Sequence, residues 1–147
     1  MINSIDDLGL NEILKDFDKL EVHEIELRID SVLQEKLGVS LENLRNSLCE
    51  SVKNRAEELA LDLPNIAPYN DYGKLLEDND SMSGFLRNEA AKLENWFLNS
   101  IQEDNKNKNL FKFVFLNKAV DDGNVLEGIV FVNKSGVIRH AFAQVDV

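Results

Sequence analysis

Large apolar residues recur at every second position near the start of the last third of the chain, and this is the period of a β-strand. Phe111, Phe113 and Phe115 set the pattern. The pair Asp122-Gly123 follows, and it suits a tight hairpin turn because such turns need residues that accept positive φ. The pattern predicts a three-stranded antiparallel meander over 110–143. Its later parts are a return strand at Val125–Val132, a turn at Asn133-Lys134-Ser135-Gly136 and a third strand at Val137–Ala143.

The first hairpin has a register that the turn predicts. If Asp122-Gly123 are the two loop residues, Phe115 lies opposite Val130, and Lys118 meets Glu127 as a cross-strand pair of opposite charge. Both faces of this sheet are then apolar, which is unusual for an antiparallel sheet with one solvated face. We therefore expect both faces to be covered, by helices, by a second copy or by a partner. The first face carries Phe111, Phe113, Phe115, Val130, Val132 and Val137, and the second carries Val114, Leu116, Ile129, Phe131, Ile138, His140 and Phe142.

Upstream of the sheet, apolar residues recur at intervals of three and four, as they do on one face of an α-helix. The clearest stripe begins after Ser40, whose hydroxyl suits an N-cap, and it places Leu48 and Val52 in its middle. No proline or glycine separates the first two stripes around Lys19, so they form either two helices or one bent helix. The predicted helices span 5–20, 22–37, 40–62 and 81–101.

Two polar stretches divide these elements. Residues 63–73 hold both prolines and both tyrosines of the protein and predict a loop, and residues 102–109 form an asparagine-rich connector without periodicity. The order of helices first and strands last predicts an α+β domain, because a parallel α/β sheet would need strands that alternate with helices along the chain. We predict a single domain over 1–147, with a helical part (1–101), a connector (102–109) and an antiparallel sheet (110–147). A length of 147 residues suffices to bury a core without a metal or a disulfide.

Charge is the most informative bulk property. The net charge is −11, yet residues 110–147 hold four acidic and four basic side chains, so the whole excess lies in residues 1–109. Such a field repels nucleic acid and anionic lipid and attracts basic surfaces. A single cysteine, together with the lack of a signal-like or membrane-spanning apolar run, predicts a cytoplasmic protein.

Candidate chemistry is sparse. His140 beside Arg139 on the last predicted strand could serve a small enzyme as an acid–base pair, although no second histidine stands near it. His23 lies in an acidic helical segment, and Cys49 neighbours the buried stripe. The spacings match no zinc site, phosphate-binding loop or serine-hydrolase elbow, so we expect no metal, no cofactor and no catalytic residues.

The remaining group of candidate functional side chains is acidic. Seven carboxylates fall between Glu12 and Asp30 with three basic residues among them, and the two tyrosines of the 63–73 loop offer large contact areas at little entropic cost. Acidic groups around such anchors speed the association of a basic partner. The partner-binding residues that we predict are Glu12, Asp16, Asp18, Glu21, Glu24, Asp30, Tyr69 and Tyr72.

Small size, acidity, few cysteines and no catalytic motif give a profile similar to that of bacterial immunity proteins. The sequence therefore predicts a cytoplasmic binding protein that neutralises a basic protein, such as a nuclease toxin, without itself binding nucleic acid or membrane. Two alternatives remain open. The apolar sheet face could join a homodimeric adaptor or structural subunit, or His140 and Arg139 could serve a small enzyme.

Overall fold

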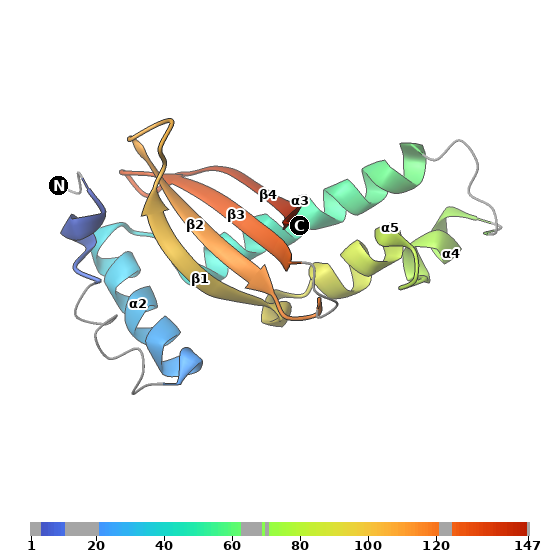
Figure 1. Cartoon of the computed structure of the whole chain (residues 1–147), viewed down its shortest axis with the longest axis horizontal. Helices are drawn as coiled ribbons and strands as arrows, with labels where there is room; N and C mark the ends of the chain where they lie inside the picture. Colours follow the sequence, from blue (N-terminus) through green and yellow to red (C-terminus); the bar gives the residue numbers. More distant parts are fainter. Residues whose placement is uncertain (1–3, 11–20, 63–68, 70, 121–124, 147) are drawn as a thin grey trace.

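The computed structural model of the chain describes residues 4–10, 21–62, 69, 71–120 and 125–146. Its centre is an antiparallel sheet with the strand order β1-β2-β3-β4 (Figure 1). The helices precede the sheet in the chain, so the mixed α and β composition and the antiparallel meander over 110–143 are confirmed. The sheet contains one strand more than predicted, because β1 precedes the meander. The strands are β1 Trp96–Glu103, β2 Leu110–Asn117, β3 Val125–Asn133 and β4 Ile138–Asp146.

The predicted helix at 81–101 is wrong beyond Ala90. The segment forms a short helix, α5 (Met82–Phe85), then the π-helical turn η3 (Leu86–Ala90) and the 3-10 turn η4 (Leu93–Asn95), before β1 begins. Trp96 ends this transition, 1% exposed, with its indole N–H donating to the Ala90 carbonyl. A bulge between Leu98 and Ser100 then breaks the two-residue period of the strand. The bulge is the reason that the apolar positions of β1 resemble a helical stripe.

The predicted register of the first hairpin is wrong by two residues. Phe115 pairs with Gly128 rather than with Val130, and Leu116 rather than Lys118 meets Glu127. A shift of two preserves which side chains share a face, so the predicted faces of β2 and β3 hold. The turn residues 121–124 lie outside the described part of the chain. The second turn is as predicted, because the Asn133 amide donates to the Val137 carbonyl at 2.9 Å.

Helices α2 (Val22–Lys36) and α3 (Leu41–Asp62) confirm the second and third predicted helices. Ser40 caps α3, since its Oγ accepts the amide N–H of Asn43 at 3.1 Å. Glu21 is extended, so α2 begins anew at Val22 rather than continuing an earlier helix. The first predicted helix is a 3-10 turn, η1 (Ile5–Leu8), which Gly9 ends at φ 67°. The rest of that prediction, residues 11–20, lies outside the described residues.

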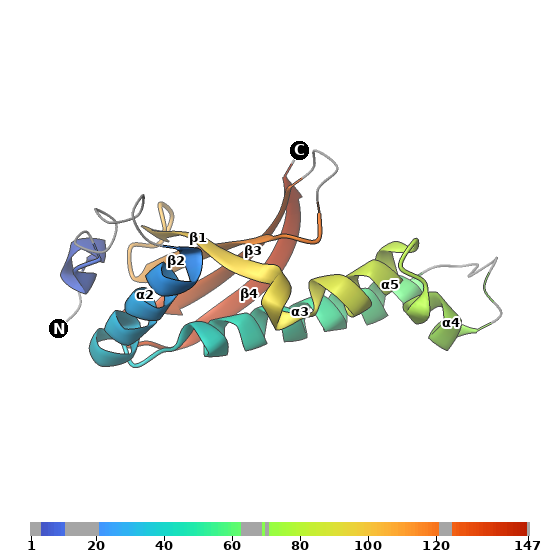
Figure 2. The same cartoon turned by 90° about the horizontal axis from the view of Figure 1, so that it is seen from below.

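The main core lies between α3 and the first face of the sheet (Figure 2). Leu48 on α3 sits directly over Gly128 on β3. A Cβ at residue 128 would overlap the Leu48 side chain and come within 2.9 Å of the Trp96 ring. The missing side chain thus lets helix and sheet approach closely. Residues of both helices and of the sheet are fully buried here, among them Leu33, Leu44, Leu48, Phe111, Phe113, Phe115, Val130 and Val132.

The second face of the sheet is less covered. Val114 and Ile129 are buried outside the main core cluster, while Leu116, Phe131 and Phe142 remain half-buried. Burial of the first face confirms the expected helix cover, and cover of the second face stays a prediction. Ile138 departs from its predicted face because a bulge on β4 places it opposite Val132.

The C-terminal part of α3 extends past the sheet and forms a helical arm with α4 (Tyr72–Glu77) and α5 (Figures 1 and 2). Helix α4 corrects the predicted loop, which reached residue 73. A second, small core of Ala60, Leu75 and Leu76 holds the arm together. Gly84 makes the arm compact, because a Cβ there would overlap the Asp78 carbonyl.

Candidate functional site: a cleft beside the edge strand

The two edge strands of the sheet, β1 and β4, differ in how far their outer backbone groups are protected. On β1, the outward amide N–H of Leu98 donates to Glu26 Oε1 at 3.4 Å, and the side chain of Glu103 accepts the Ile5 amide of η1 at 2.8 Å. A bulge interrupts the same edge. Such features are the usual means of protecting an edge strand against further pairing. The β4 edge has a bulge only at its start, near Arg139.

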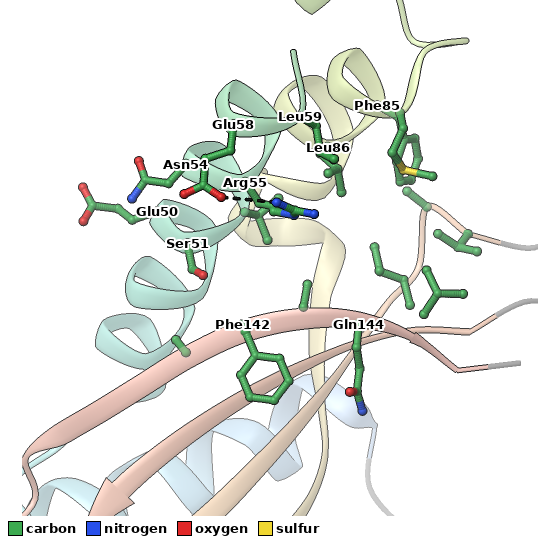
Figure 3. Close-up of a pocket in the computed structure, with 18 of the residues that line it drawn as sticks. Glu50, Ser51, Asn54, Arg55, Glu58, Leu59, Phe85, Leu86, Phe142 and Gln144 are labelled. Atoms are coloured by element: carbon green, nitrogen blue, oxygen red, sulfur yellow. Dashed lines mark hydrogen bonds and ion pairs between the residues drawn. The ribbon is translucent and has the colours of Figure 1, made fainter. Parts of the chain in front are cut away.

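The free edge of β4 borders a cleft of about 1180 Å³. The cleft lies between β4, the exposed flank of α3 and the helical arm (Figure 3). Every residue from Ile138 to Val145 lines it. Its volume exceeds the 300–1,000 Å³ or so that is common for small-molecule pockets, which favours a larger ligand.

The hydrogen bonds of the second hairpin show which β4 amides point into the cleft. Asn133 on β3 donates its N–H to Val137, and backbone groups of successive strand residues point to opposite sides. The β3 residues that face β4 therefore include Phe131 and Ile129, whose partners are His140 and Phe142.

The intervening β4 residues must point their backbone groups outward. Ala141, Ala143 and Val145 thus present N–H and C=O groups to the cleft. The same alternation, followed across the sheet, places the Leu98 amide on the outer side of β1, where its bond to Glu26 is found. Along the described part of β4, no hydrogen bond to a residue outside the β3–β4 hairpin is formed.

One end of the cleft is apolar. Met82 and Val145 stand at its mouth, 58% and 53% exposed. Leu59, Phe85 and Leu86 line the arm side, as Figure 3 shows. Residues Val120 and Leu126 complete this end from the sheet. An apolar hollow with exposed residues at its rim suits the insertion of an apolar side chain from a partner.

The flank of α3 supplies the polar side of the cleft. Glu50, Asn54 and Glu58 are exposed there, and Glu58 pairs with Arg55 at 3.3 Å. Asp80 adds a further exposed carboxylate from the arm. In Figure 3, Phe142 and Gln144 project from β4 away from α3, so they do not fill the space between strand and helix. The cleft thus combines free backbone groups, an apolar end and carboxylates.

The candidate catalytic pair lies at the cleft but is not assembled for proton transfer. The ring of His140 packs on Phe142, with 5.2 Å between centroids. Within the described residues, no hydrogen bond or ion pair links His140 or Arg139 to a second side chain. Burial raises the pKa of the Cys49 thiol to about 11, which keeps this thiol protonated. His23 is exposed at the start of α2.

Two further findings concern metal sites and membranes. Across residues 4–10, 21–62, 69, 71–120 and 125–146, no three metal-binding side chains gather closely enough to hold an ion. None of the described helices has the length and apolarity required to cross a bilayer.

The predicted acidic residues have different environments. Glu21 and Glu24 are exposed at the start of α2, whereas Glu12, Asp16 and Asp18 lie outside the described residues. Asp30 has a structural role, because its carboxylate accepts the Leu41 amide at 2.8 Å and a Gln34 side-chain N–H at 2.7 Å. Asp30 therefore helps to fix the start of α3.

The two tyrosines lie in the helical arm, at the opposite end of the molecule from α2 (Figures 1 and 2). Both pack against the small core around Leu75. The Tyr69 hydroxyl donates to Asp78, and this bond, followed by one from the Asp80 amide, lowers the pKa of the Asp78 carboxyl. Among the described residues, Glu21, Glu24 and Asp30 on and before α2 are thus not brought together with the two tyrosines.

The cleft was missed by sequence reasoning, although some of its signals are local. Ala141 and Ala143 put small side chains on an edge strand, and β4 contains neither proline nor lysine to discourage pairing. That β4 is an edge strand depends on the order of the whole sheet. Comparisons of the chain with protein families, with curated proteins and with solved structures give no match.

Proposed function

We propose that this protein is a small acidic binding protein that neutralises a basic protein partner, in the manner of an immunity-type inhibitor of a toxin such as a nuclease. The observation that carries the proposal is the distribution of charge. The net charge of −11 falls entirely in residues 1–109, which supply the helices and β1, whereas residues 110–147 are balanced. A field of this kind accelerates encounter with a basic protein and disfavours direct binding of nucleic acid.

Exposed carboxylates line the cleft, and one of them, Glu58, is paired with Arg55. Glu50 and Glu58 project from α3, and Asp80 projects from the arm. They surround a cleft with an apolar end, so an approaching partner would meet charge at the rim and apolar surface within. Rim charges act chiefly on the association rate, and buried apolar anchors act chiefly on the dissociation rate.

Capture followed by inhibition tests the proposal. Immobilised protein is exposed to a lysate of its source organism at low ionic strength, bound proteins are eluted with salt, and each is purified. We expect a basic protein that rebinds the pure chain and loses its own activity at one equivalent of inhibitor. Capture of acidic proteins only, or rebinding without any loss of activity, would contradict the proposal.

A second function is favoured by the less covered sheet face. Leu116, Phe131 and Phe142 are half-buried there, and the rings of the two phenylalanines lie 6.3 Å apart. A homodimeric adaptor or structural subunit would cover these side chains with a second copy. Sedimentation of the pure chain distinguishes this candidate, since a monomer at high micromolar concentration eliminates it.

A further inference from the structure

We propose that the free edge of β4 receives an extended segment of the basic partner, which adds to the sheet as a fifth strand and occupies the cleft. This inference rests on the proposed function and specifies how the partner is held. Strand addition of this kind draws affinity from main-chain hydrogen bonds and specificity from hollows that accept alternate side chains.

The backbone of β4 provides the first part of the argument. Ala141, Ala143 and Val145 point N–H and C=O groups into the cleft. They are spaced at every second residue, as the hydrogen bonds to an added strand would require. On the opposite edge, the corresponding Leu98 amide is bonded to Glu26. The sheet thus closes one edge and leaves the other available.

The side chains of β4 provide the second part. Ala141 and Ala143 are small and lie on the face of the sheet that α3 covers, so they leave the space beside the strand open. His140, Phe142 and Gln144 lie on the opposite face, and Figure 3 shows Phe142 and Gln144 directed away from α3. Ile138 and Val145 lie on the same face as the two alanines, and between them no large side chain of β4 blocks an added strand on the α3 side.

Charge and polarity favour an occupant with basic and apolar residues. An added strand would run beside Glu50 and Glu58 on α3, of which Glu58 is paired with Arg55. With Asp80, three carboxylates line the cleft against the two guanidinium groups of Arg55 and Arg139, so a slight acidic excess remains. Toward the C-terminal end of β4 it would meet Met82, Phe85 and Val145. Side chains of a strand alternate between its two faces, so residues on the helix-facing side would contact both the carboxylates and the apolar end. A second copy of β4 would bring Arg139 and His140 but few other basic groups.

The test uses 12-residue peptides selected on the whole, immobilised protein from a random display library. Selected peptides are synthesised, and amide exchange of the isotopically labelled protein is followed by NMR with and without each peptide. We expect peptides with a net positive charge, and we expect slower exchange at the amides of Ala141, Ala143 and Val145. Slower exchange confined to other residues would overturn the inference, as would failure to select any peptide.

A pair of variants at one position provides the matched control. Ala143→Pro removes the outward N–H without removing a bond to β3, and Ala143→Ser retains that N–H. We expect the proline variant to bind the peptides about tenfold more weakly or worse, because a main-chain bond is lost and the ring obstructs the added strand, while the serine variant binds as the original does. Equal binding by both variants would overturn the inference.

The remaining outcomes separate this inference from the function on which it rests. If the proline variant does not fold, the exchange measurement on the original protein still decides the site. If the pure chain dimerises with the same three amides protected, the occupant is a second copy and the inference is wrong. If a basic partner is captured and inhibited while these amides exchange freely, the proposed function survives and strand addition fails.

Discussion

The contact between Leu48 on α3 and Gly128 on β3 permits a test of how the helix sits on the sheet. Leu48 is fully buried, so Leu48→Ala should lower the free energy of unfolding by about 2 to 5 kcal/mol, through lost burial and the cavity that remains. Gly128→Ala places a methyl group against Leu48 and the Trp96 ring. Such overpacking should cost about 1 to 3 kcal/mol.

The double variant should be more stable than the sum of the two losses predicts. The methyl group of Ala at residue 128 would occupy part of the space that Leu48→Ala vacates, so the clash and the cavity offset each other. We expect a favourable coupling energy of about 1 kcal/mol or more. Urea unfolding followed by circular dichroism gives each free energy, and Trp96, the only tryptophan, provides a fluorescence signal from the same contact.

A distant substitution provides the control for this cycle. Leu33→Ala on α2 creates a cavity in the same core, and Leu33 is not among the atoms nearest to a Cβ at residue 128. Its combination with Gly128→Ala should be additive within about 0.5 kcal/mol. Additivity of Leu48→Ala with Gly128→Ala would refute the placement of α3 over β3.

Three further predictions concern single side chains. Asp30→Ala should lower the free energy of unfolding by about 1 kcal/mol in urea titrations, because the Leu41 amide loses its acceptor, and an unchanged midpoint would contradict this. Tyr69→Phe should raise the pKa of Asp78 toward its ordinary value in an NMR titration. The folded-state pKa of Asp78 is lowered, so the stability it contributes is present above the unfolded-state pKa and is lost as the pH falls through the folded-state value. That loss should be smaller in the variant. The Cys49 thiol, with a pKa of about 11, should react with a disulfide reagent at pH 8 only after urea unfolding, and rapid reaction of the native protein would refute its burial.

The parts of the fold that the sequence predicts are those whose signal is local and regular. Helix α3 carries an uninterrupted apolar stripe with Ser40 before it, and its bounds are close to those predicted. The meander was predicted from alternating residues and from the turn that follows Asn133. An error of two residues in the register does not change which side chains share a face of the sheet, because side-chain direction repeats every two residues.

The parts that were not predicted depend on irregular backbone or on distant packing. The bulge after Leu98 hides the alternation of β1, because it puts Leu98 and Ile101 on one face of the sheet although they lie three residues apart, which is also a helical spacing. The bulge at Arg139 moves Ile138 to the other face for the same reason. Whether a carboxylate such as Asp30 steers a partner or caps a helix depends on the position of Leu41, which no local pattern specifies.

The candidate site illustrates the same limit. Its acidic character follows from composition, but the cleft exists because β4 is the last strand of the sheet and because α3 continues past it. The tyrosines, which the sequence predicts as partner contacts beside the acidic residues, pack against the small core of the arm, and their role in binding stays a prediction.

The most direct measurement is the association rate of the captured basic partner over a series of salt concentrations. Two variants with equal total charge are compared: Glu50→Gln, Glu58→Gln and Asp80→Asn at the cleft, and Glu35→Gln, Glu42→Gln and Glu94→Gln, which are exposed on α2, α3 and η4. We predict that the first variant associates about threefold to tenfold more slowly at low salt, with a weaker salt dependence, and that the second changes little. Binding of a basic partner at the cleft would be contradicted if the association rate did not depend on the salt concentration. It would also be contradicted if only the second variant associated more slowly.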